Sequence, residues 1–209
     1  MRDVVVEASP LVSQATVRRV KRDLPKAISA VEAYLAVRVP AVTVVVAGRT
    51  GLATWSLRAL GGRGDARARR QYWREEFAEA ATVYGYTTVM TSGRALIGLY
   101  ARPRRKQPET VFPTLVHELV HAVQLDRPGR RDERRQMQDR RLGLVEHPMG
   151  LVMAMSALQT LDEGEAYAVQ HALCPESAVG DEFGGGSFDP GPVVSCLGEA
   201  VKNWAATAR

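Results

Sequence analysis

The chain has 209 residues, of which 45% are hydrophobic and 24% are charged, and its formal net charge is +5. This length and composition predict one globular domain over residues 1–209 that is large enough to bury a sizeable core. No apolar run is long enough to cross a bilayer, and the short Val4-Val5-Val6 stretch is not a secretion signal, so we expect a cytoplasmic protein with no membrane partner.

The first part of the chain combines predicted helices with one strand. Ser9-Pro10 is a helix start signal, and the amphipathic pattern after it continues to about Val37, with an interruption or kink near Pro25. A glycine-rich stretch at 61–64 separates two later helical patterns. In chain order the predictions are a helix at 9–37, a strand at 42–47 and helices at 50–60 and 65–81.

Two β-rich runs follow, at residues 86–91 and 95–100. The connecting residues Ser92-Gly93-Arg94 are typical of a turn, so the two runs predict a β-hairpin. The strand at 42–47 is the third strand of the predicted sheet.

Residues 117–121 read His117-Glu118-Leu119-Val120-His121, an H-E-x-x-H pentapeptide inside an apolar run. The surrounding pattern predicts a helix, with Thr110 as its cap and Arg127-Pro128-Gly129 as its end. Residues four apart lie on the same face of a helix, so both imidazoles can bind one metal ion while Glu118 stands beside them. The alternative is a buried helix whose two histidines are merely hydrogen-bonded.

The pentapeptide resembles the active-site helix of zinc peptidases, whose catalytic zinc normally has three protein ligands. The metzincin subclass is excluded, because Gln124 and Arg127 stand where its glycine and its further ligand would be. Residues 161–168, Leu-Asp-Glu-Gly-Glu-Ala-Tyr-Ala, resemble the glutamate helix of gluzincins. This resemblance implies Glu163 as the third ligand and a compact peptidase of the minigluzincin kind.

The resemblance implies a zinc-dependent metallopeptidase acting on a peptide or protein substrate. Zn²⁺ held by His117, His121 and Glu163 lowers the pKa of its water to about 7. Glu118 is then the general base, which takes the proton as the water attacks the scissile carbonyl and passes it to the leaving amine.

The residues around Glu163 also predict a helix of their own. Apolar residues from Leu151 to Leu173 recur at helical spacing, and Cys174-Pro175 ends the pattern. Gly164 inside the pattern lets two backbones come close enough to share a small ion. The alternative is a capping box, in which Thr160 begins the helix and Glu163 bonds back to the backbone. In that case Asp162, Glu165 and His171 are the replacement ligands.

Candidates for stabilising the oxyanion follow Glu163 on the same predicted helix. Tyr167 is four residues beyond Glu163 and His171 is eight beyond, so both project from roughly the same face. His147 is a loop alternative; for each of the three, the other interpretation is a half-buried aromatic or a surface imidazole. Many gluzincins place an acidic residue near this helix to hold a ligand histidine. Four residues past Glu163, this chain has Tyr167 rather than an acidic residue. The group that holds the ligand histidine is therefore not identified from the sequence.

The resemblance to zincins implies an α+β fold class. We expect a small mixed β-sheet with backing helices in an upper lobe at about 1–127, a mainly helical lower lobe at about 128–209, and an active-site cleft between them. Zincins commonly present an edge strand beside the metal, to which an extended peptide adds as one more strand. The candidate edge strand is residues 95–100, and an ordinary buried strand is the alternative.

The C-terminal part of the chain gives fewer signals. Residues 192–206 predict a final helix, and the glycine-rich loop at 184–187 is a candidate flap near the cleft. Cys174 and Cys196 flank this loop, and a disulfide between them would close it. Without a signal peptide we expect free thiols.

Arginine supplies most of the positive charge, with 24 arginines against 4 lysines, concentrated at 63–74, 102–106 and 127–141. Such clusters favour a rival class, a nucleic-acid-associated protease with a SprT-like role. Acidic residues interrupt two of the clusters, as on solvated helix faces, which argues against a nucleic-acid partner. A second rival is an inactive zincin-like scaffold, although the intact Glu118 favours an enzyme. No pattern indicates the oligomeric state.

Overall fold

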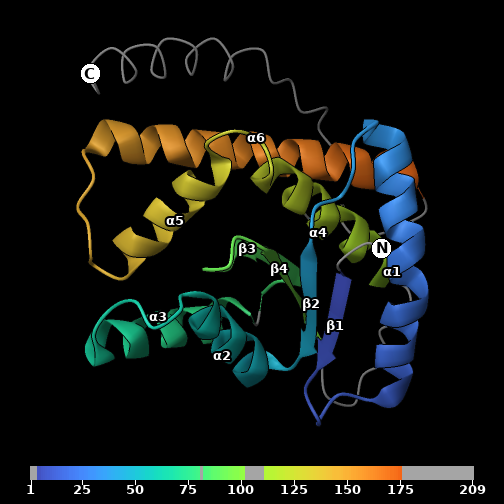
Figure 1. Ribbon diagram of the computed structural model, residues 1–209, viewed down its shortest axis with the longest axis horizontal. Helices are drawn as coiled ribbons and strands as arrows, with labels where there is room; N and C mark the ends of the chain where they lie inside the picture. The colour runs from blue at the N-terminus through green and yellow to red at the C-terminus, as the bar shows by residue number, and fades with distance from the viewer. Residues whose placement is uncertain (1–3, 81, 102–110, 176–209) are drawn as a thin grey trace.

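The computed structural model describes residues 4–80, 82–101 and 111–175, which combine helices with one small β-sheet (Figure 1). The elements in this part of the chain are β1 (Val4–Ala8), α1 (Gln14–Leu35), β2 (Val42–Ala47), α2 (Arg49–Ala59), α3 (Ala66–Glu79), β3 (Gly85–Val89), β4 (Ala95–Tyr100), α4 (Val111–Leu125), α5 (Arg130–Arg141) and α6 (Met149–Leu173). No helix of the described residues is long and apolar enough to cross a membrane.

The four strands form a mixed sheet in the order β1-β2-β4-β3. β1, β2 and β4 are parallel, and β3 is antiparallel to β4. The predicted mixed sheet and the predicted hairpin are therefore confirmed. The prediction that residues 95–100 form an edge strand is wrong, because β4 lies between β2 and β3. Its residues Ala95 to Leu99 are all buried, as expected for an inner strand, and β3 is the edge on this side.

Helices cover both faces of the sheet. Val42, Val44 and Val46 of β2 face a core shared with α1, α4 and α6, whereas Val45 and Ala47 face a second core under α2. This alternation follows from the two-residue period of a strand. Figure 1 shows α6 running across α4, against which it packs. Because α4 lies between the sheet, α1 and α6, nearly all of its residues are buried.

The N-terminal region differs most from its prediction. The first helix begins at Gln14 rather than at Ser9-Pro10, and the side chain of Ser13 caps it by accepting a hydrogen bond from Thr16 N at 3.1 Å. The helix runs through Pro25 without a break. β1, which was not predicted, pairs in parallel with β2. Over five residues the alternation of apolar and polar side chains is too short to predict a strand from the sequence. This strand is therefore recognised only from its pairing with β2.

Two predicted features near the C-terminus, the helix at 192–206 and the loop at 184–187, lie outside the described residues, as does Cys196. Cys174 is buried just after α6 and has no disulfide partner among the described residues, and burial raises the pKa of its thiol.

A buried carboxylate on α1 gives the fold a dependence on pH. Asp23 is 5% exposed, and the Nε atoms of Arg19 and Arg22 donate hydrogen bonds to it. Burial acts to raise the pKa of Asp23, but the two arginines outweigh this effect and hold the pKa below its ordinary value. The ion pairs therefore stabilise the fold above the ordinary pKa, and this contribution is lost as the pH falls through the folded-state pKa.

We expect Asp23→Asn to lower the free energy of unfolding by about 2 kcal/mol near neutral pH, the contribution typical of hydrogen bonds to a charged group. The difference from the wild type should shrink as the pH falls through the folded-state pKa of Asp23, because below it the carboxyl group is protonated in both the folded and the unfolded protein. Urea unfolding at several pH values measures the difference. An effect of the same size in acid would contradict a role for the Asp23 charge.

Candidate metal centre

Helix α4 presents the three polar residues of the pentapeptide from a buried position. His117, Glu118 and His121 are 9%, 4% and 7% exposed. The helix ends at Leu125, just before the predicted stop signal, whereas the predicted cap Thr110 lies outside the described residues. Polar groups this deeply buried need partners, and those partners come from β3, from α6 and from α4 itself.

Helix α6 brings Glu163 to the histidine pair. The helix is continuous from Met149 to Leu173, and Thr160 lies in its interior, where its hydroxyl donates to the Ser156 carbonyl at 3.1 Å. The capping-box alternative is therefore wrong, since no helix begins at Thr160. The side chain of Glu163 is 42% exposed and reaches His117 and His121 across the helix interface.

The nitrogen and oxygen atoms of these three residues lie close enough to share one ion. The two Nε2 atoms are 3.1 Å apart, and each is 3.3 Å from one carboxylate oxygen of Glu163. Ligand atoms bound at about 2.0–2.2 Å to a tetrahedral zinc ion stand about 3.3–3.6 Å from one another. Two imidazoles and a carboxylate are also ligands that zinc accepts. His117, His121 and Glu163 therefore fit a zinc ion.

The carboxylates and imidazoles of this cluster shift one another's pKa values. Burial acts to raise the pKa of Glu163, but hydrogen bonds with His117 and His121 hold it well below its usual range. Burial acts to lower the pKa of His121, but Glu163 and Glu118 raise it above its ordinary value. A carboxylate that stays ionised is what a metal site needs, because protons compete with the metal for the ligands.

The edge strand β3 holds the carboxylate of Glu118. The hydroxyl of Thr87 lies 2.7 Å from Glu118 Oε2, to which it donates, and 3.0 Å from the Glu118 carbonyl. A Cβ atom at Gly85 would stand 2.8 Å from Glu118 Oε1 and 2.9 Å from Thr114 Cγ2, so only glycine leaves room for this carboxylate. Sequence reasoning missed both contacts, because they depend on how β3 packs against α4.

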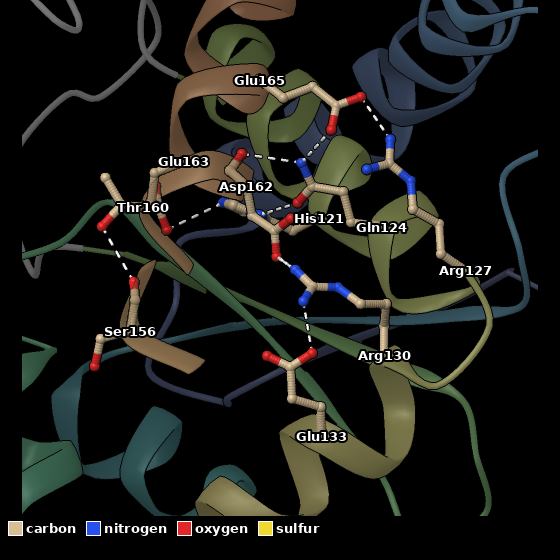
Figure 2. Close-up of polar contacts among 10 residues, drawn as sticks. All are labelled: His121, Gln124, Arg127, Arg130, Glu133, Ser156, Thr160, Asp162, Glu163 and Glu165. Atoms are coloured by element: carbon tan, nitrogen blue, oxygen red, sulfur yellow. Dashed lines mark hydrogen bonds and ion pairs between the residues drawn. The ribbon is translucent and has the colours of Figure 1, made fainter. Parts of the chain in front are cut away.

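The two acidic replacement ligands are occupied elsewhere (Figure 2). Asp162 forms an ion pair with Arg130. Glu165 forms an ion pair with Arg127 at 2.5 Å and accepts a hydrogen bond from Gln124 at 3.0 Å. Of the acidic residues in this segment, Glu163 is therefore the one that approaches the histidines.

The structure brings one of the three oxyanion candidates to the site. The ring of Tyr167 contacts that of His117, with 4.6 Å between centroids, and Tyr167 lines the cleft into which the metal cluster opens. Burial and the charges of Glu163 and Glu118 raise the pKa of its phenol. His171 is exposed and His147 lies in the connection between α5 and α6, and neither lines the cleft.

The candidate metal centre opens into a cleft of about 530 Å³. Its walls come from helices α2 to α6 and from β3 with the residues just before it. His117, Glu118, His121 and Glu163 all contribute to the lining. A small or extended ligand can therefore reach the cluster from solvent.

Comparison with known proteins gives no family for this chain. No protein-family model matches it, and neither the curated proteins nor the solved structures that were compared gave a match. The function must therefore be argued from the residues of the site.

Proposed function

We propose that this protein is a zinc-dependent metallopeptidase of the gluzincin type, with a zincin-like fold divided into an upper and a lower lobe. The observation that carries the proposal is the meeting of His117, His121 and Glu163 beside Glu118 at an open cleft. A purely structural zinc site is normally closed by four protein ligands, whereas three ligands at a cleft leave one position for a reacting water.

The chemistry assigns a role to each residue. Zn²⁺ held by the three candidate ligands would supply a Lewis acid that makes hydroxide available near neutral pH. Glu118 takes the proton of the attacking water and delivers it to the nitrogen of the leaving amine. The Thr87 hydroxyl holds the Glu118 carboxylate in one orientation, so its proton transfer needs little rearrangement.

Tyr167 is our candidate for stabilising the oxyanion that forms on the scissile carbonyl. It lines the cleft beside His117, and its raised pKa keeps the phenol protonated and able to donate a hydrogen bond.

The substrate would bind along β3. Among the described residues this strand has a hydrogen-bonded neighbour, β4, on one side only, and several of its residues line the cleft. An extended peptide can therefore add to the sheet as one more strand, with its scissile bond near Glu118. The cleft volume lies in the range of about 300–1,000 Å³ that is typical of ligand sites.

The rival functions find less support. Several arginines of the basic clusters form ion pairs with neighbouring carboxylates, among them Arg63 with Asp139, Arg131 with Asp126 and Arg141 with Glu76. Charges neutralised in this way contribute little to phosphate binding. An inactive zincin-like scaffold would need no general base, yet Glu118 is buried and held by a hydrogen bond.

Metal removal tests the proposal directly. We expect the purified protein to contain zinc and to cleave casein, to lose cleavage when a chelating phenanthroline removes the metal, and to regain it when Zn²⁺ is added. The non-chelating phenanthroline isomer is the control and should have no effect. A protein that binds no zinc, or that cleaves equally well without it, would overturn the proposal.

A further inference from the structure

The residue one turn after His121 on α4 is a buried glutamine. Gln124 is 2% exposed and is among the largest fully buried side chains of the described residues. A buried amide must satisfy one oxygen acceptor and two N–H donors, since each unsatisfied group costs about 1–3 kcal/mol. The partners of Gln124 therefore determine which way its amide is turned.

All three positions of the Gln124 amide are used (Figure 2). Its Nε2 donates to the Asp162 carbonyl at 2.9 Å and to Glu165 Oε2 at 3.0 Å. Its Oε1 lies 2.7 Å from His121 Nδ1. The Asp162 carbonyl and the Glu165 carboxylate only accept hydrogen bonds, so the amide nitrogen must face α6 and the amide oxygen must face His121.

The orientation of the amide determines the tautomer of His121. Because Gln124 Oε1 only accepts, Nδ1 of His121 carries the hydrogen, which leaves the lone pair of a neutral ring on Nε2. Nε2 is the atom that points to His117 and Glu163. A ligand histidine needs this arrangement before a metal arrives.

Arginines that follow α4 hold the two acceptors on α6 in place. Arg127 forms an ion pair with Glu165, and Arg130 forms one with the side chain of Asp162 and another with Glu133. His117 has no such support, since its buried Nδ1 finds no hydrogen-bond partner among the described residues.

We propose that Gln124 is the positioning residue of this metal centre, which fixes the tautomer and orientation of His121 through its bonds to the α6 segment that carries Glu163. The inference rests on the proposed function, because it concerns the same zinc. The inference also identifies the group that orients the ligand histidine His121. In this chain that group is a neutral amide on α4, the helix that carries both histidines.

Gln124→Leu tests the proposal by removing the amide while keeping a similar volume. We expect its zinc affinity, measured by competition with a fluorescent chelator, to fall about 10–100-fold, as for other groups that orient a metal ligand. The control is Gln138→Leu, because Gln138 is also a buried glutamine, whose amide donates hydrogen bonds to the Thr88 hydroxyl and the Val89 carbonyl of β3. This control should lose stability but keep its zinc affinity.

A second readout needs neither zinc nor activity. In the metal-free wild type at alkaline pH, where the ring is neutral, histidine nitrogen NMR should show His121 protonated on Nδ1. Gln124→Leu should show a mixture of the two tautomers. If this variant does not fold, Glu165→Leu removes one acceptor of the amide at a partly exposed position and should lower zinc affinity by up to about 10-fold.

The outcomes separate this inference from the proposed function. A wild type that binds no zinc refutes the proposed function. A wild type that binds zinc, with His121 protonated on Nε2 or with unchanged affinity in Gln124→Leu, refutes only the role of Gln124.

Discussion

Glu163→Ala should lose its zinc. The carboxylate is one of three candidate ligands and stands 3.3 Å from the Nε2 atoms of both histidines. Loss of a group that only orients a ligand costs about 10–100-fold in metal affinity, so loss of a ligand itself should cost more than about 100-fold. The variant removes a half-exposed side chain at a helix position that alanine favours, so we expect it to fold.

Metal content after dialysis and chelator competition both measure this loss. Glu79→Ala is the matched control, since Glu79 is also a partly exposed glutamate that lines the same cleft, on the wall formed by α3. The control should retain zinc as the wild type does. Retention of zinc by Glu163→Ala would remove Glu163 from the ligand set and, with it, the assignment of α6 as the gluzincin-type glutamate helix.

Glu118→Gln should keep its zinc and lose its turnover. Glutamine has the same shape, and its amide oxygen can still accept the hydrogen bond from Thr87, so the position of the side chain is preserved. The amide cannot take a proton from the attacking water. Because general acid–base catalysis contributes about 10²–10⁴-fold, we expect kcat to fall by that factor while the zinc content stays unchanged.

Cleavage of casein or of a quenched peptide measures the effect, with metal content determined on the same sample. Glu75→Gln is the control: it makes the same change in charge at an exposed position of α3 that does not line the cleft, so kcat should stay close to that of the wild type. Turnover that survives in Glu118→Gln would exclude the general base and favour another reaction. Loss of zinc together with turnover would instead show that the substitution disturbed the site.

The sequence predicted much of the local structure. The helices at residues 50–60 and 65–81, the strand at 42–47 and the hairpin are all found within a few residues of the expected limits. The histidine pair could be predicted from the sequence alone. A four-residue spacing in one helix places both rings on the same face, independently of the tertiary structure. Glu163 required the resemblance to gluzincins, since 42 residues separate it from His121. Its role as a metal ligand remains a prediction.

The order of the strands could not be read from the chain. Both β3 and β4 are β-rich and half of a hairpin, and nothing in either run says which of them also pairs with β2. The assignment of 95–100 as the edge was wrong for this reason. β1 was missed because its partner β2 lies more than thirty residues later, beyond α1.

The chain alone determined which chemical groups are present and which of them a single helix brings together. Periodicity and spacing act over one or two turns, so they predicted the His117-Glu118-His121 face without knowledge of any neighbour. Only the tertiary structure decided what surrounds that face: Thr87 and Gly85 on β3 beside Glu118, and the α6 segment that engages Gln124 and presents Glu163. These contacts join elements that are distant in sequence, so they depend on the strand order and on how the helices pack. Both are determined by the burial of apolar residues from the whole chain.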